Sequence, residues 1–463
     1  MNSPDDSTPS HAIDRVHDVL VIGAGPAGAA IAILLARAGW SVALVEKQPF
    51  PRRKVCGECI AASNLPLLDA LGIGPAFSQS AGPALRRVAL LHGRRTVEAA
   101  LPSAADARHP WGRALGRERL DTLLLEAARA AGAKVLQPWA VQSLEGGPGA
   151  WSCVLRAVEG APEAGSSATG RTARLGARVA VAAHGSWERL PSERAARRER
   201  RAPSDLLAFK ANFRHVALAP GILPVLAFAG GYGGMVVEGD DEKGTLATVA
   251  CCIRRDRLDA VRRAQPGLRA GEAVEGLLRA ELGGVGDALR AARREGPWLA
   301  AGPLDPGVHL RTDDGLLRVG NAAGEAHPIL GEGLSMALQS AFLLADELLA
   351  TRAHAPLQAS TQAIRAPVKT ASAPDAAAHR AIARRYAVAW KRRFRPRLAI
   401  AALFAHAAMR PVVSRALMML AARWPGLLTW GARRGGKVSC AADPATIAKL
   451  AVGAGPMREQ GRR

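Results

Sequence analysis

The fold of this chain is decided by residues 17–46, which read HDVLVIGAGPAGAAIAILLARAGWSVALVE. Residues 19–22 form an unbroken apolar run, as expected of a strand buried on both faces of a parallel sheet. Residues 23–28 follow at once with the spacing G-x-G-x-x-G, and a helical pattern rich in Ala, Ile and Leu comes next. A second apolar segment, 41–45, ends at Glu46. The stretch therefore predicts a strand–helix–strand unit that binds a dinucleotide.

Each position of this motif has a physical role. Gly23 permits the tight turn out of the strand, Gly25 lets the backbone approach a pyrophosphate, and Gly28 lets the helix pack close to the sheet. The free N–H groups of the first helical turn then face the phosphates. Glu46 follows Gly23 at close to the ~20-residue spacing of an acid that binds the adenosine ribose. The predicted binding residues of this unit are Gly23, Ala24, Gly25, Pro26, Ala27, Gly28, Glu46 and Lys47.

The composition of the chain limits its domain number and the kinds of partner it can have. The chain has 463 residues, of which 49% are hydrophobic and only 4% aromatic, so we expect two domains with aliphatic cores. The formal net charge of +22 is carried mostly by Arg and reflects either a coding bias or an anionic partner surface. Residues 1–16 do not form a signal or transit peptide, and no apolar run reaches the ~20 residues of a membrane span. The six cysteines show no regular framework, so we expect a cytoplasmic protein, with a peripheral position at the inner face of a membrane as the alternative.

A loop rich in cysteine and charge follows the dinucleotide unit. It contains Cys56 and Cys59 in a C-x-x-C spacing, which suits either a redox dithiol, half of a zinc site or simple loop packing. Zinc would need a second pair, and the other four cysteines are scattered along the chain. The sequence therefore favours packing, and no metal site is expected.

The segment 52–59, RRKVCGEC, resembles the geranylgeranyl reductase-like branch of FAD-dependent oxidoreductases, which is related to the aromatic-hydroxylase flavoprotein monooxygenases. The resemblance implies that Lys54, Cys56 and Gly57 lie on a loop that crosses beneath the flavin ring and borders the substrate pocket. The pattern R-x-x-L-D-x-x-L at 117–124 resembles the same flavoproteins and implies that Arg117 lies near the dinucleotide. The alternative for Arg117 is a surface position on an ordinary helix.

Residues 321–337, NAAGEAHPILGEGLSMA, resemble the second FAD motif of these flavoproteins. Asn321 takes the place of the usual acid, and its amide can still hydrogen-bond a ribityl hydroxyl. Gly331 and Gly333 leave room for the flavin ring where a helix, 334–349, begins. The resemblance thus adds Asn321, Ala322, Pro328, Gly331, Gly333 and Leu334 to the FAD-binding residues.

Two segments depart from the family patterns. His184 stands where aromatic hydroxylases usually carry the acid of D-G-x-x-S, so NADPH or NADH as electron donor stays open. The glycine cluster 230–234 lies where geranylgeranyl reductases often carry Y-x-W-x-F-P, and its Trp and Pro are absent, so prenyl specificity does not carry over.

We expect an α/β fold in which an antiparallel-sheet substrate domain is inserted into a Rossmann-like FAD-binding domain with a parallel sheet. The FAD-binding domain is predicted to comprise 15–85, 101–187 and 303–352, and the substrate domain 86–100 and 204–302. Linkers are expected at 188–201 and 353–376. The strands of 206–253 carry few polar side chains, which predicts an apolar substrate.

The predicted helical C-terminal segment, 375–435, is basic throughout. No acid occurs between Asp375 and Asp443, whereas arginines alternate with apolar stretches. The segment is either a cap packed on the FAD-binding domain or a peripheral contact with an anionic membrane. No recognition motif accompanies the charge, so nucleic acid is not an expected partner.

The chemistry expected is that of bound FAD, and two routes fit. The first is hydroxylation or epoxidation of an apolar molecule by reduced flavin and oxygen, and the second is reduction or formation of a carbon–carbon double bond. Halogenation is less expected because the signature W-x-W-x-I-P is absent. A non-catalytic flavin-binding partner is a further alternative. Proton-transfer candidates are Glu58 and His327, with His184 and Glu325 beside them.

Overall fold

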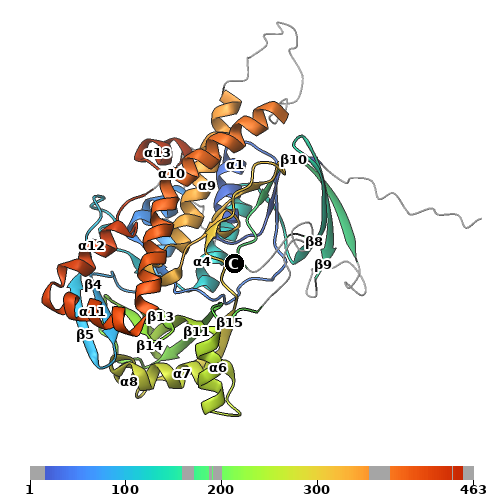
Figure 1. Cartoon of the computed structure of the whole chain (residues 1–463). Coiled ribbons are helices and arrows are strands. Elements are labelled where there is room, and N and C mark those ends of the chain that lie inside the picture. Colours follow the sequence, from blue (N-terminus) through green and yellow to red (C-terminus); the bar gives the residue numbers. More distant parts are fainter. Residues whose placement is uncertain are drawn as a thin grey trace, which may run out of the picture.

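The computed structural model describes residues 16–158, 171–186, 190, 201–353, 376–440 and 442–451 (Figure 1). The N-terminal tail, most of the two expected linkers and the residues just after Ser186 lie outside the described residues.

The first sheet contains the dinucleotide unit. Its strand order is β7-β2-β1-β10-β9-β8, and β17 also pairs with β10. Neighbours from β7 to β10, and β17 with β10, are parallel, whereas β9 and β8 extend the sheet antiparallel. The bounds are β1 (Val16–Ile22), β2 (Val42–Val45), β7 (Lys134–Leu136), β8 (Trp139–Gly147), β9 (Ala150–Ala157), β10 (Thr172–Ala182) and β17 (Leu317–Arg318).

Apolar helices cover one face of this sheet. Helix α1 (Pro26–Arg37) buries ten of its residues against α9 (Gly333–Ala353) and α4 (Arg117–Ala130), because small Ala side chains allow close approach. Two shorter helices, α2 (Leu65–Ala70) and α3 (Gly74–Ser80), join the same core. The predicted Rossmann-like architecture is confirmed.

The second sheet draws strands from two separate parts of the chain. Its order is β15-β11-β14-β13-β12-β4-β5, antiparallel except for the parallel pair β12 and β4. The segment 86–100, which was predicted to join this sheet, forms a hairpin that turns at Gly93 with φ of 58°. The bounds are β4 (Arg87–His92), β5 (Arg95–Ala100), β11 (Leu206–Arg214), β12 (Ile222–Phe228), β13 (Gly231–Asp241), β14 (Gly244–Arg254) and β15 (Arg293–Ala301).

The two faces of the second sheet have different neighbours. Helices α6 (Arg255–Ala264), α7 (Ala270–Glu281) and α8 (Gly283–Ala288) pack on one face and form its own apolar core. The other face turns toward the FAD-binding domain and the C-terminal helices (Figure 1). Two-stranded pairs connect the layers: β3 (Cys59–Ile60) with β6 (Arg113–Ala114), and β16 (Gly307–Val308) with β18 (Gly324–Glu325).

The C-terminal segment is helical, as predicted, with α10 (Ala376–Met409), α11 (Pro411–Arg423), α12 (Gly426–Arg434) and α13 (Pro444–Ala451). Helix α10 packs along α9, and its last carbonyl, of Met409, accepts a hydrogen bond from Gly230 at 3.0 Å. Helices α11 and α12 then lie over β4 and β5 (Figure 1). The segment therefore touches both domains.

One helix corrects a prediction about membrane spans. Within α9, Gly333–Thr351 is long and apolar enough to cross a membrane, with a mean hydropathy of 1.2. However, 67% of that stretch is buried inside the structure, and the helix packs between α1 and α10. We therefore assign α9 as a core helix of the FAD-binding domain.

Candidate active site

The glycine-rich turn lies between the end of β1 and the start of α1, as the motif requires. Gly23 has φ of 103°, and a Cβ there would lie 2.6 Å from the carbonyl oxygen of Ala183. A Cβ on Gly28 would lie 1.8 Å from the carbonyl oxygen of Gly23. Only glycine fits at both positions, which explains the tight turn and the close helix–sheet packing.

Gly25 has open space around it, unlike Gly23 and Gly28, which are closely surrounded by backbone atoms. A Cβ there would meet only the Nη2 of Arg117, at 3.8 Å, so the turn is open on this side. Gly25 also caps α1 without a side chain, which leaves the first N–H groups of the helix available to an anion. Arg117 is buried here, and Asp121 holds its guanidinium through two hydrogen bonds of 2.7 and 2.8 Å. The alternative of a surface position is therefore excluded, and Arg117 lies beside the dinucleotide turn, as the resemblance implied.

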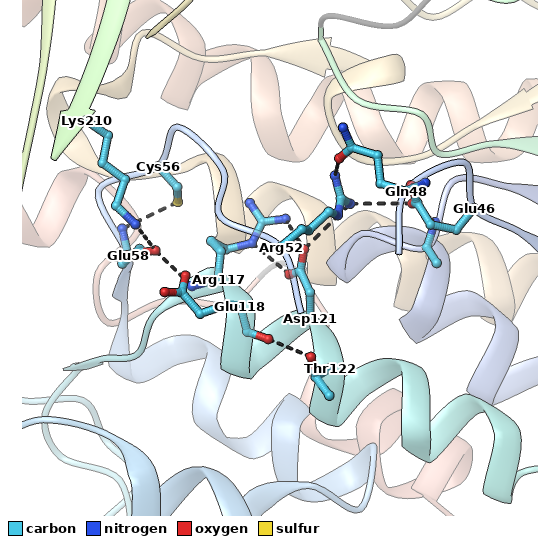
Figure 2. A network of polar contacts seen from close by, with 11 residues as sticks. Glu46, Gln48, Arg52, Cys56, Glu58, Arg117, Glu118, Asp121, Thr122 and Lys210 are labelled. Atoms are coloured by element: carbon cyan, nitrogen blue, oxygen red, sulfur yellow. Dashed lines mark hydrogen bonds and ion pairs between the residues drawn. The ribbon is translucent and has the colours of Figure 1, made fainter. Parts of the chain in front are cut away.

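Glu46 braces the glycine turn from the end of β2. Its carboxylate accepts hydrogen bonds from the backbone N–H groups of Ala24 and Gln48, both at 3.0 Å. Arg52 lies 3.4 Å from the same carboxylate and 3.7 Å from Asp121. Figure 2 shows these contacts as one chain from Glu46 through Arg52 and Asp121 to Arg117. Contact of Glu46 with a ribose stays a prediction.

The cysteine-containing loop ends on a buried carboxylate. Oε1 of Glu58 accepts from the backbone N–H of Arg117 at 2.8 Å and forms an ion pair with Lys210 on β11 (Figure 2). Its Oε2 accepts from the Thr248 hydroxyl at 2.7 Å. These contacts hold Glu58 in a left-handed conformation, φ 56°, that is uncommon outside glycine. Glu58 and Lys210 are fully buried, so the pair joins the two domains.

A second carboxylate extends this cluster. Glu238 on β13 accepts from the side-chain amide of Asn212 at 2.7 Å and also contacts the Thr248 hydroxyl. Burial, and then the neighbouring Glu58 carboxylate, raise the pKa of Glu238 to about 9. A protonated Glu238 can donate to Thr248, which in turn donates to Glu58. The expectation that this sheet carries few polar side chains missed this buried cluster.

The second motif forms a turn that leads into α9. The side-chain amide of Asn321 donates to the Ser186 hydroxyl at 2.7 Å, which brings the motif to the end of β10. Gly331 has φ of 64°, and Gly333 has no atom within 4 Å of a Cβ position, so the start of α9 is open. Arg397 of α10 lies 3.4 Å from the buried Glu332 carboxylate and holds this turn from behind.

A tyrosine–histidine pair lies beside the second motif. The Tyr232 hydroxyl is 3.2 Å from Nδ1 of His327, and the rings of His327 and the exposed His406 are 5.4 Å apart. Burial and the nearby His406 lower the pKa of His327 to about 4, so its imidazole is neutral at pH 7. Burial raises the pKa of Glu325 to about 7.

His184 and the cysteines have less defined roles. His184 lies at the end of β10, where its Nδ1 is 3.1 Å from the Gly185 carbonyl oxygen. Cys56 and Cys59 are free thiols. Within the described ranges no group of three or more His, Cys, Asp or Glu side chains is arranged to hold a metal ion.

A cavity of about 400 Å³ brings the two motifs together. Its walls come from the FAD-binding domain, the second sheet and helices α10–α12. The predicted site residues that line it are Gly25, Pro26, Ala27, Lys54, Cys56, Gly57, Glu58, Arg117, Asn321, Glu325, Pro328, Gly331, Gly333 and Leu334. Those that do not line it are Gly23, Ala24, Gly28, Glu46, Lys47, His184, Ala322 and His327.

These residues fit FAD. The open sides of Gly25 and Gly333 face one continuous cavity, and the uncapped start of α1 is available to phosphate. The fold and the site thus define a flavin-dependent oxidoreductase. Residues 16–251 match the FAD binding domain family, and the chain belongs to that family.

Solved structures of other proteins share this fold. The chondrochloren halogenase CndH, a myxobacterial FAD-dependent halogenase, is 19% identical with a TM-score of 0.65, over 95% of this chain and 97% of that one. PqsL, a probable FAD-dependent monooxygenase from Pseudomonas aeruginosa, is 17% identical with a TM-score of 0.60, over 86% and 98%. At these identities the likeness shows the fold alone.

Curated relatives match shorter parts. Conditioned medium factor receptor 1 of Dictyostelium discoideum is 28% identical over 372 residues, 74% of this chain and 66% of that protein. Menaquinone reductase of Mycobacterium tuberculosis is 33% identical over 124 residues, 27% of this chain and 29% of the reductase. The matches thus span less than two thirds of either relative. The chain is an FAD-dependent oxidoreductase.

Proposed function

We propose that the chain is a monooxygenase that hydroxylates or epoxidises an apolar small molecule of the lipid, polyketide or isoprenoid class. The observation that carries the proposal is the cavity, which continues from the flavin motifs along the second sheet. Its walls there are Val88, Leu90, Leu223 and Val225, all apolar. Apolar walls with few polar groups are typical of sites for apolar ligands.

Bound FAD supplies the redox chemistry, including activation of oxygen when reduced. The residues of this chain supply position and a dry environment. The sheet walls exclude water, and the start of α9 directs its positive end toward the flavin site. The ion pair of Glu58 with Lys210 fixes the loop that lines the cavity floor. No protein nucleophile is needed for this chemistry.

The test begins with the yellow holoprotein under anaerobic conditions. NADPH or NADH is added while flavin absorbance is followed, and oxygen is then admitted with candidate apolar substrates. Rapid bleaching, followed by substrate-dependent oxygen uptake and an oxygenated product, is expected. Oxygen uptake that yields only hydrogen peroxide with every lipid or polyketide offered would contradict the proposal. Absence of bleaching would point to a separate electron donor.

The second candidate is reduction of a carbon–carbon double bond. It is supported by the similarity to menaquinone reductase and by the tyrosine–histidine pair at the flavin site. Reduction of an alkene needs a hydride, which reduced FAD would supply, and one proton. Tyr232 lines the cavity and can supply a proton from its hydroxyl, and His327 and the exposed His406 lead from it toward the surface.

One experiment separates the two candidates. Reduced holoprotein is mixed anaerobically with menaquinone, and the quinone is analysed by mass spectrometry. A gain of two hydrogen atoms that persists after the quinol is reoxidised in air, with return of flavin absorbance, supports reduction of a side-chain double bond. An unchanged quinone under these conditions, together with oxygenated product in air, supports the monooxygenase. The cavity beyond the flavin motifs gives no support to a non-catalytic flavin carrier.

A further inference from the structure

Helix α11 carries apolar side chains on its outer surface. Its buried residues, Ser414, Met418 and Ala421, follow helical spacing and face the protein. Its exposed apolar residues are Val412, Val413, Leu417, Met419 and Leu420. A helix at the surface of a globular protein normally presents polar side chains to water. The outer surface of α11 is therefore suited to a non-aqueous partner.

Helix α12 continues this surface. Trp424, just before the helix, and Trp430 within it are 56% and 54% exposed. The guanidinium of Arg423 lies 5.5 Å from the ring centre of Trp424, and that of Arg434 lies 5.6 Å from that of Trp430. Paired Trp and Arg side chains are typical of segments at a membrane–water interface. We call the exposed apolar residues of 412–430 the interfacial patch.

Apolar exposure is concentrated in this part of the molecule. Among the described residues, thirteen large apolar side chains are exposed, and eight of them belong to the interfacial patch. An exposed cluster of this kind marks an interaction surface rather than the usual scatter of single residues.

The positive charge of the C-terminal helices indicates which kind of partner the patch binds. Residues 376–442 contain fourteen Lys and Arg and no Asp or Glu. Arg410, Arg415 and Arg433 on and beside the patch are exposed. Anionic headgroups attract such side chains, whereas a symmetric dimer through the patch would set like charges against each other. The charge therefore favours an anionic bilayer over a second copy of this chain.

The patch is also the outer wall of the cavity. Leu417, Leu420 and Leu427 line the cavity and are at the same time 37%, 40% and 41% exposed. Behind them, Leu428 and Ala432 pack with Val225 and other apolar side chains of the second sheet. An apolar path thus runs from the outer surface of α11 and α12 toward the flavin motifs.

We infer that the interfacial patch inserts into an anionic bilayer, and that a lipophilic substrate passes from the bilayer into the cavity between Leu417, Leu420 and Leu427. The passage of substrate rests on the proposed function, whereas the insertion of the patch does not.

The first experiment measures binding without turnover. Holoprotein is sedimented with vesicles of phosphatidylcholine, alone or mixed with phosphatidylglycerol. The full chain is expected to bind the mixed vesicles, and the double variant Trp424→Ser/Trp430→Ser to bind about tenfold more weakly or worse. Leu268→Ser is the control because Leu268 is also an exposed large apolar residue but lies between α6 and α7. The control is expected to bind like the natural chain.

Three outcomes would overturn the inference. The first is absence of binding to any vesicle, and the second is equal loss of binding in the Leu268→Ser control. The third is a dimer in sedimentation velocity that Trp424→Ser/Trp430→Ser dissociates, because the patch would then be a protein interface. Raising salt from about 0.1 M to about 1 M shortens the Debye length from about 10 Å to about 3 Å and should weaken binding.

A second readout reports insertion directly. Lipids brominated in their acyl chains should quench part of the tryptophan fluorescence of the natural chain, and less in the double variant. Vesicle binding without turnover of any lipophilic substrate would leave insertion intact and contradict the proposed function. Turnover of a detergent-dissolved substrate without vesicle binding would support the proposed function and contradict insertion of the patch.

Discussion

The backbone N–H of Arg117 donates a hydrogen bond to the side chain of Glu58, with 2.8 Å between the nitrogen and Oε1. Arg117 begins α4, and its guanidinium is held by Asp121 beside the dinucleotide turn. Glu58 belongs to the loop that lines the cavity and is paired with Lys210 of the second sheet. This one contact, shown in Figure 2, therefore links the residues around the dinucleotide turn to the loop that lines the cavity.

Breaking the ion pair of Glu58 and Lys210 should destabilise the protein strongly. Lys210→Met leaves a buried carboxylate without its cation, which typically costs about 3–5 kcal/mol. Glu58→Gln/Lys210→Met removes both charges and should recover part of that loss. Thermal unfolding of the holoprotein measures both effects.

The control for this prediction is Arg290→Met. Arg290 pairs with Asp287 at the surface, where ion pairs contribute little. If Lys210→Met lowered the melting temperature no more than Arg290→Met, the buried pair would not hold the domains together.

Glu238 should make stability depend on pH. Its pKa is raised from 4.5 to about 9, so between these values the folded protein keeps a proton that the unfolded chain loses. The contribution of Glu238 to the free energy of unfolding therefore falls as pH rises, by at most about 1.4 kcal/mol per pH unit. Glu238→Gln removes the titration and keeps an amide oxygen as acceptor. The variant should gain stability over the natural chain as pH rises from about 6 to about 9.

Melting temperatures of the two proteins across that pH range test the prediction. Groups remote from this buried cluster titrate equally in both proteins, so the difference between the two curves reports the titration of Glu238 within its cluster. Parallel curves would mean that Glu238 is already ionised in the folded protein.

Substitutions of Gly25 and Gly28 in the first motif should have different effects on stability and on FAD binding. A Cβ at Gly28 would lie 1.8 Å from backbone oxygen, so Gly28→Ala should lower stability even without cofactor. A Cβ at Gly25 would lie 3.8 Å from a side-chain nitrogen, so Gly25→Ala should fold normally and bind FAD more weakly. Gly25→Asp adds negative charge and should abolish FAD retention. Apoprotein melting and flavin content after gel filtration separate these effects, and a fully yellow Gly25→Asp would contradict the phosphate-loop assignment.

The sequence predicts the structure well where a local motif determines the backbone geometry. The positive φ of Gly23 and the burial of residues 19–22 follow from local spacing alone, and the helix predicted at 334–349 lies within the observed α9.

The buried polar cluster could not be predicted in the same way. Lys210 and Asn212 alternate with Phe209, Ala211 and Phe213, a signal that both polar side chains share the face opposite the apolar core. Their partners Thr248 and Glu238 come from strands whose register depends on long-range pairing. Local patterns do not specify that register.

Tyr232 should discriminate between the two proposed chemistries. If its hydroxyl supplies the proton in double-bond reduction, Tyr232→Phe should lower that rate by about 100-fold or more while flavin reduction by the donor stays unchanged. If the enzyme is a monooxygenase, the same variant should alter turnover little. His327 is neutral above its pKa of about 4, so the rate should show no step from His327 between about pH 6 and about pH 8. The matched control is Tyr386→Phe, because the Tyr386 hydroxyl is also buried but donates to the Arg318 carbonyl at 2.8 Å, away from the cavity. Equal losses in both variants would indicate a structural effect and contradict the role of Tyr232 as proton donor.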